Sequence, residues 1–129
     1  MPLLVFDVVE GQNVSDLRKM LDCAHQVVLD VFQVPARDRY QIVNEHKAGL
    51  MVIEDTGLGF ERSRQMTVLR VFTSPRSQEQ KHLFMQRLAA ELNEQCGIRG
   101  EDLMISFFSN EREDWSFGMG EAQYATGKL

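Results

Sequence analysis

Two stretches of the sequence repeat apolar residues at helical spacing. In the first, the apolar positions follow one another at intervals of three or four: Val14, Leu17, Leu21, Ala24, Val28 and Phe32. This spacing predicts one apolar face of an amphipathic helix. Asn13 is a suitable N-cap for that helix, and Pro35 ends it and opens a short loop.

The second helical pattern follows the capping sequence Ser77-x-x-Gln80, in which each side chain can bond the backbone of the other residue. Its apolar face is made by Phe84, Leu88, Leu92 and Cys96. Gly97 comes next and is expected at the position that closes the helix.

Four other segments are rich in branched and aromatic residues and predict strands: residues 2–9, 39–45, 66–73 and 102–109. Between the second and third strands, the glycines in residues 47–65 indicate turns. Gly57-Leu58-Gly59 resembles part of a dinucleotide-binding loop, but it lacks the third glycine and a following helix. We therefore expect an ordinary turn there.

The order strand, helix, strand occurs twice along the chain. We expect a single domain over residues 1–129, built from two β-α-β halves at about 2–60 and 61–129. The predicted fold is α/β (α+β), with a four-stranded mixed sheet and both helices on one face. Neighbouring strand residues such as Leu4 and Val5 are both apolar, so the opposite face needs a cover, which a homo-oligomer would supply.

Composition narrows the classes of function. The chain has 129 residues, 14.8 kDa and a net charge of −5, which argues against binding of nucleic acid or of an anionic membrane surface. No apolar run reaches the roughly 20 residues of a membrane span, and no basic region precedes the first apolar run as in a secretory signal. The two cysteines are too few for a disulfide framework, so we expect a cytoplasmic protein.

Common catalytic centres are not indicated. His25, His46 and His82 are scattered and have no partners at metal-ligand spacing, so no metal site is predicted. The serines have no G-x-S-x-G setting, and a serine hydrolase is therefore not expected.

The start of the chain is more informative. Met1 is followed by the small residue Pro2, a pair from which the initiator methionine is normally removed. Removal would leave a secondary amine at the start of a strand. An α-amino group titrates near pH 8, and burial or a neighbouring charge would move its pKa, so this nitrogen can act as an acid or a base.

Two charged residues lie in connections that can approach the same strand end. Asp38 follows the first predicted helix and Arg76 follows the third predicted strand. An amine, a carboxylate and a guanidinium around one pocket would suit a small oxo-acid, whose carboxylate an arginine can hold with two hydrogen bonds. The alternatives are a surface pair of Asp38 with Arg37 or Arg39, and a solvated turn at Arg76.

Several segments together resemble the tautomerase superfamily and, within it, the malonate semialdehyde decarboxylase family. The match spans nearly the whole chain and is carried by Met-Pro-Leu-Leu at 1–4, Val-Pro-x-x-Asp-Arg-Tyr-Gln at 34–41, Glu-Asp-Thr-Gly-Leu-Gly at 54–59, Pro-Arg-Ser-x-Glu-Gln-Lys at 75–81, Cys-Gly-Ile at 96–98, Asp-Trp-Ser-Phe-Gly at 114–118 and Thr-Gly-x-Leu at 126–129.

This resemblance implies a duplicated β-α-β tautomerase fold, a homotrimer and a reaction without metal or cofactor. Pro2 matches the catalytic proline, Asp38 its acidic partner and Arg76 a substrate-binding arginine. The remaining matched positions are apolar walls of the pocket: Trp115, Phe117, Tyr124 and Leu129. In such a site a cationic proline polarises the aldehyde carbonyl while arginine binds the carboxylate of the small-molecule oxo-acid.

Ser74 departs from the family pattern, because the better-known decarboxylase has a second arginine at this position. A serine can donate one hydrogen bond but has no charge, and we expect carboxylate binding to weaken by about 1.5–3 kcal/mol. Arg70 lies about 13 Å back along the same strand, too far for simple replacement. Two alternatives therefore stay open: a tautomerase or hydratase of 2-oxo acids such as phenylpyruvate or acetylenic acids, and a non-catalytic trimer that binds a ligand.

Overall fold

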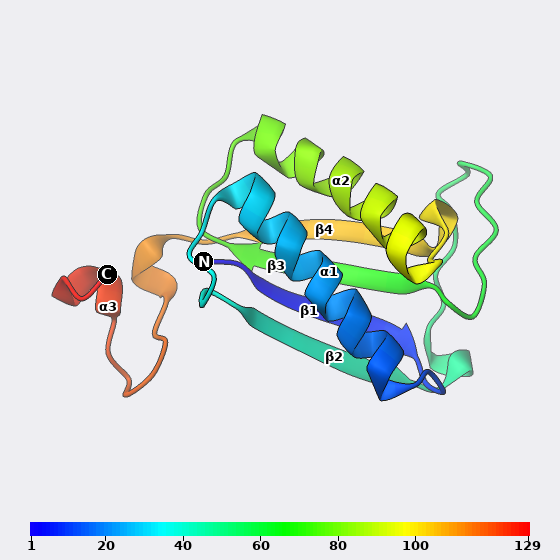
Figure 1. Cartoon of the computed structure of the whole chain (residues 1–129), viewed down its shortest axis with the longest axis horizontal. Helices are drawn as coiled ribbons and strands as arrows, with labels where there is room; N and C mark the ends of the chain where they lie inside the picture. Colours follow the sequence, from blue (N-terminus) through cyan, green and yellow to red (C-terminus); the bar gives the residue numbers. More distant parts are fainter.

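The four strands form one mixed sheet in the order β2-β1-β3-β4 (Figure 1). The computed structural model describes residues 1–129, with β1 at Leu3–Val9, β2 at Tyr40–His46, β3 at Thr67–Thr73 and β4 at Leu103–Ser109. The outer pairs β1–β2 and β3–β4 are parallel, and the central pair β1–β3 is antiparallel. The predicted four-stranded sheet of two β-α-β units is confirmed.

Both long helices cover the same face of the sheet, as predicted (Figure 1). They are α1 at Val14–Phe32 and α2 at Gln78–Cys96. The capping box of Ser77 and Gln80 is present, and Gly97 closes α2 with a φ of 68°. Asn13 occupies the N-cap position of α1, but its amide donates to Asp16 at 3.4 Å and makes no bond to the helix backbone.

The core lies between the helices and the covered face of the sheet. Phe84 of α2 is fully buried at its centre, stacked on Phe32 at 5.2 Å between ring centroids and edge-on to Phe107 at 5.6 Å. Cys23 is buried in this core, and Cys96 is only partly buried beside it. Because Phe32 also ends α1, the packing of the core fixes the position of the chain at the edge of the functional pocket.

The other face of the sheet carries mainly apolar side chains and no covering helix. We refer to it as the uncovered face; it is lined by Leu3, Val5, Asp7, Tyr40, Ile42, Asn44, His46, Val68, Arg70, Phe72, Met104, Ser106 and Phe108. The rings of Phe72 and Phe108 stack on it at 4.9 Å. One polar network crosses this face, in which Asp7 accepts hydrogen bonds from His46 at 2.7 Å and Arg70 at 2.8 Å.

Strand direction brings distant parts of the sequence to one edge of the sheet. Because β1 and β3 are antiparallel, the start of β1 lies beside the end of β3, with Leu3 opposite Phe72. Since β3 and β4 are parallel, Thr73 lies opposite Ser109 and both strands end at this edge. The first residues of the chain therefore meet the segments that follow β3 and β4.

Short helical segments outside the regular pattern complete the chain: η1 at Ala48–Leu50, η2 at Gly100–Asp102, η3 at Arg112–Asp114 and α3 at Gln123–Thr126. The predicted turn at residues 57–59 is present, where the Asp55 carboxylate accepts from the backbone N–H groups of Gly57 and Gly59. None of the helices has the length and apolar composition to cross a bilayer.

Candidate active site

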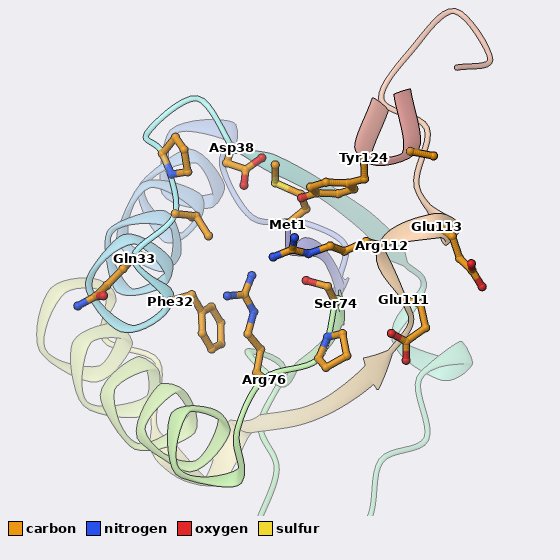
Figure 2. A pocket seen from close by; sticks show the side chains of 14 residues that line it. Met1, Phe32, Gln33, Asp38, Ser74, Arg76, Glu111, Arg112, Glu113 and Tyr124 are labelled. Atoms are coloured by element: carbon orange, nitrogen blue, oxygen red, sulfur yellow. The ribbon is translucent and has the colours of Figure 1, made fainter. Parts of the chain in front are cut away.

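A pocket of about 910 Å³ opens at the edge of the sheet where β1 begins (Figure 2). Five parts of the chain line it: the first residue, the end of α1 with its following loop, the turn after β3, the segment after β4 and α3. Four of the sequence-predicted site residues lie together in its wall: Asp38, Ser74, Arg76 and Tyr124.

The chain terminus reaches this pocket through Met1, which is half-buried and lines it. The next residue, Pro2, is buried and does not itself line the pocket. Burial lowers the pKa of the terminal amine, and the positive charges of Arg76 and Arg112 lower it further, whereas the Asp38 carboxylate raises it. The amine therefore loses its proton more readily than an exposed one does.

Asp38 presents a buried carboxylate to the same space. The residue is 6% exposed, and its Oδ2 atom has no hydrogen-bond partner. Burial raises the pKa of this carboxyl group, opposed by the nearby terminal amine and by Arg76. The loop that carries Asp38 is held by its own N–H, which donates to Pro35 at 2.9 Å, and by the ring of His25, which bonds the carbonyl of Ala36.

The alternative surface pairs of Asp38 are not formed. Arg39 instead donates to Asp22 at 2.6 Å and to Gln41 at 2.8 Å. An unpartnered carboxylate oxygen that is nearly excluded from water costs free energy, and in a pocket it is therefore a candidate for proton transfer.

Arg76 lies opposite Asp38 on the turn that follows β3. Its Nε donates to Thr73 Oγ1 at 3.2 Å, and its guanidinium carbon lies 5.0 Å from the centre of the Phe32 ring. Burial lowers the pKa of this guanidinium, which nevertheless stays charged at neutral pH. Arg70 does not take the place of the missing second arginine, because it faces Asp7 on the uncovered face.

The predicted apolar wall is only partly in the pocket. Tyr124 lines the pocket, and burial raises the pKa of its phenol. Phe117 packs edge-on against Tyr124 at 5.8 Å and stacks on Trp115 at 5.6 Å, and neither Phe117 nor Trp115 lines the pocket in the single chain. Leu129 is 60% exposed and also lies outside the lining.

Arg112 is a pocket residue that the sequence interpretation missed. It lies in η3, and its guanidinium carbon is 5.5 Å from the centre of the Tyr124 ring. The signal for it is in the strand register. Thr73 and Ser109 are opposite each other at the ends of parallel strands, and each is followed three residues later by an arginine, Arg76 and Arg112.

A second, smaller hollow of about 270 Å³ lies at the opposite edge of the sheet. It is formed by the segment after β1 and the end of α2, just as the larger pocket is formed by the segment after β3 and the end of α1. The hollow includes Asn13, Lys19, Gln65 and Cys96. The two halves of the chain thus form two related hollows, and only the larger one contains the first residue.

The larger pocket combines a terminal amine, a carboxylate and cationic guanidinium groups. The amine and the carboxylate can exchange protons with a ligand, and the guanidinium groups can bind an anion. The chain has no group of three or more His, Cys, Asp or Glu side chains arranged to hold a metal ion.

Comparison with known families gives two overlapping matches, both to families described as tautomerase enzyme. One covers residues 38–118 and the other covers residues 2–61. Together they span residues 2–118, which include all four strands, both long helices and the pocket segments up to η3.

Individual relatives span the full length of the chain. "Probable tautomerase YrdN" of Bacillus subtilis (strain 168) is 53% identical over 129 residues and 100% of both chains. A crystal structure of malonate semialdehyde decarboxylase is 45% identical, with a TM-score of 0.95 over 98% of each chain. A second malonate semialdehyde decarboxylase, inhibited by 3-bromopropiolate, is 36% identical, with a TM-score of 0.93 over 98% of this chain and 97% of the other.

Proposed function

Because the chain belongs to the tautomerase superfamily and, within it, to the malonate semialdehyde decarboxylase family, we propose that it decarboxylates malonate semialdehyde to acetaldehyde and carbon dioxide without a cofactor. The observation that carries this proposal is the position of the terminal amine beside an unpartnered carboxylate and an unpaired guanidinium. These are the groups needed to polarise a carbonyl, handle a proton and bind a carboxylate.

The mechanism begins with removal of Met1, which leaves Pro2 with a free secondary amine at the pocket. In its protonated form this amine donates a hydrogen bond to the aldehyde oxygen. Arg76 binds the carboxylate, and the bond between the carboxylate carbon and the methylene carbon breaks. The electron pair moves onto the carbonyl oxygen as an enolate, which the ammonium stabilises, and protonation of the methylene carbon gives acetaldehyde.

In this scheme Asp38 supports the protonated amine and takes part in proton transfer. Its buried carboxylate lies in the same pocket as the Met1 amine, where burial lowers the pKa of that amine and the Asp38 charge opposes this shift. We propose that Asp38 acts in the same sense on the Pro2 amine once Met1 is removed. It also orients a water molecule or transfers a proton. Pro2 and Asp38 are thus the proposed catalytic groups, and Ser74, Arg76 and Tyr124 are proposed to contact the substrate.

A trimer is part of the proposal. We propose that three copies of the chain pack through their uncovered faces, where Ile42, Met104 and Phe108 are each more than 40% exposed in the single chain. Trp115, Phe117 and Leu129 then complete the apolar surroundings of the pocket.

The test is incubation of the purified protein with malonate semialdehyde, followed by NMR. Decarboxylation at the rate of the blank would reject the proposal. The Pro2→Ala variant still allows removal of Met1 but leaves a primary amine on a flexible residue, and we expect a loss of kcat/KM of at least about 100-fold. A preparation that retains Met1, verified by mass spectrometry, is the matched control and is expected to be inactive.

Tautomerisation of a larger 2-oxo acid is the second candidate, favoured by the size of the pocket and by the aromatic ring of Tyr124 in its wall. A rate of phenylpyruvate ketonisation well above the rate of decarboxylation would favour it. A free amine at pH 7 would favour it as well, because tautomerisation needs a base to remove the proton next to the carbonyl.

A further inference from the structure

Two guanidinium groups face the same space inside the pocket without an acidic partner. Arg76 comes from the turn after β3 and Arg112 from η3, and their side chains point toward each other in front of Met1 (Figure 2). The ion pairs of the chain lie elsewhere and include neither arginine. Two like charges that converge in this way repel each other until an anion lies between them.

The acidic residues next to Arg112 do not place a carboxylate between the two guanidinium groups. The Glu111 side chain accepts a hydrogen bond from the backbone of Asp114, and Glu113 points away from the guanidinium (Figure 2). Asp38 lies in the pocket, but beyond hydrogen-bond distance of either arginine. The space between the two guanidinium groups is therefore open to a ligand.

Both the backbone segment that carries Arg112 and its guanidinium group are held by neighbouring residues. The N–H of Asn110 donates to the carbonyl of Thr73 at 2.9 Å, which ties the segment after β4 to the end of β3. The Trp115 indole donates to the side chain of Asn110 at 2.7 Å, and the Tyr124 ring lies against the guanidinium. Arg112 is thus fixed relative to the turn that carries Ser74 and Arg76.

We infer that Arg112 is a second substrate-binding residue, which holds the substrate carboxylate together with Arg76 and supplies from η3 the positive charge that Ser74 does not supply from the turn after β3. The inference rests on the proposed function for the identity of the substrate. It commits the site to short oxo-acids with a free carboxylate, because an ester or amide of the same acid cannot pair with two cations.

The experiment measures binding separately from turnover. The probe is 3-hydroxypropanoate, which has the carboxylate of malonate semialdehyde and an alcohol in place of the aldehyde, and its dissociation constant is obtained by ligand-observed NMR. We expect Arg112→Ala to weaken binding about 10- to 100-fold and Arg112→Lys to weaken it less. Arg64→Ala removes an exposed arginine outside the pocket and is expected to bind the probe like the wild type.

A double variant separates charge from packing. In Arg112→Ala/Ser74→Arg the positive charge returns from the turn after β3, but the contact with Tyr124 does not. Recovery of at least tenfold in affinity, with KM for malonate semialdehyde falling more than kcat rises, would establish that Arg112 acts by its charge. Unchanged probe affinity in Arg112→Ala, or no recovery in the double variant, would overturn the inference.

The binding result also distinguishes this inference from the proposed function. If the wild type does not decarboxylate malonate semialdehyde but Arg112→Ala still loses affinity for the probe, the role of Arg112 stands and the decarboxylase proposal fails. If the wild type decarboxylates and Arg112→Ala binds the probe normally, the decarboxylase proposal stands and the role of Arg112 fails.

Discussion

At the scale of single residues, Asp38 is kept in an environment that disfavours its charge. Burial raises the pKa of this carboxyl in the folded chain, so the folded state holds the proton more tightly than the unfolded state. The ionised carboxylate therefore destabilises the fold above the pKa of an unfolded aspartate, and this penalty disappears as the pH falls below that value.

Replacing Asp38 by asparagine should consequently stabilise the protein while impairing catalysis. We expect Asp38→Asn to have a higher Tm than the wild type at pH 7, with the difference shrinking toward pH 3, and to lose about 100-fold or more in kcat/KM. Thermal denaturation followed by circular dichroism at both pH values checks the first part. Glu10→Gln, an exposed acid outside the pocket, is the control and should leave Tm and activity unchanged.

The terminal amine gives a second prediction at this scale. Burial and the charges of Arg76 and Arg112 lower the pKa of the Met1 amine, and Asp38 opposes them; the same surroundings are expected to lower the pKa of the Pro2 amine after Met1 is removed. If the ammonium form is the catalytically active one, activity is present below the pKa of the amine and falls as the pH rises through that pKa. This fall is expected at a lower pH than for an exposed amine. A pH–rate profile with malonate semialdehyde measures this; activity that instead rises with pH through this range would assign the reaction to the free amine.

At the scale of elements, the sequence predicted every long helix and strand, because the helices repeat apolar residues at intervals of three or four and the strands are rich in branched and aromatic residues. The pocket was less accessible to prediction. Asp38 and Arg76 stand next to predicted element ends and were identified, whereas Arg112 lies in a single helical turn whose position depends on the pairing of β3 with β4. Trp115 and Phe117 were expected in the pocket wall; in the single chain they stack on each other next to Tyr124 and do not line the pocket, an arrangement that no local pattern reveals.

The start of α2 offers a test of one element. Ser77 caps this helix directly after Arg76, so its loss should loosen the helix end that anchors the turn. We expect Ser77→Ala to reduce the free energy of unfolding by about 0.5–2 kcal/mol, measured by urea denaturation. Ser15→Ala, an exposed serine in the first turn of α1 without a capping bond, should change it by far less; equal losses in the two variants would contradict a capping role.

At the scale of the whole molecule, the uncovered face is the surface through which we propose that chains associate. Its apolar side chains surround one charged network, in which burial alone would raise the pKa of Asp7 but hydrogen bonds from His46 and Arg70 keep it below its ordinary value. A network of this kind is directional, so it would favour one orientation of the packed sheets over others.

A charge placed on this face should dissociate the trimer. Ile42 lies on this face in the edge strand β2 and is 49% exposed in the single chain. Ile42→Glu is expected to give a monomer in sedimentation velocity at concentrations where the wild type is a trimer. Val52→Glu is the matched control, because Val52 is 79% exposed but lies in the loop after η1, away from the sheet face. A wild type that sediments as a monomer would refute the assembly.

The smaller hollow at the far edge of the sheet bears on how many molecules of a covalent inactivator one polypeptide can bind. Its counterpart of the terminal amine, at the start of β3, is an ordinary peptide nitrogen inside the chain, which has no basicity and cannot be alkylated. An inactivator derived from the substrate should therefore reach its endpoint at one equivalent per polypeptide, even though each polypeptide contains the same architecture twice.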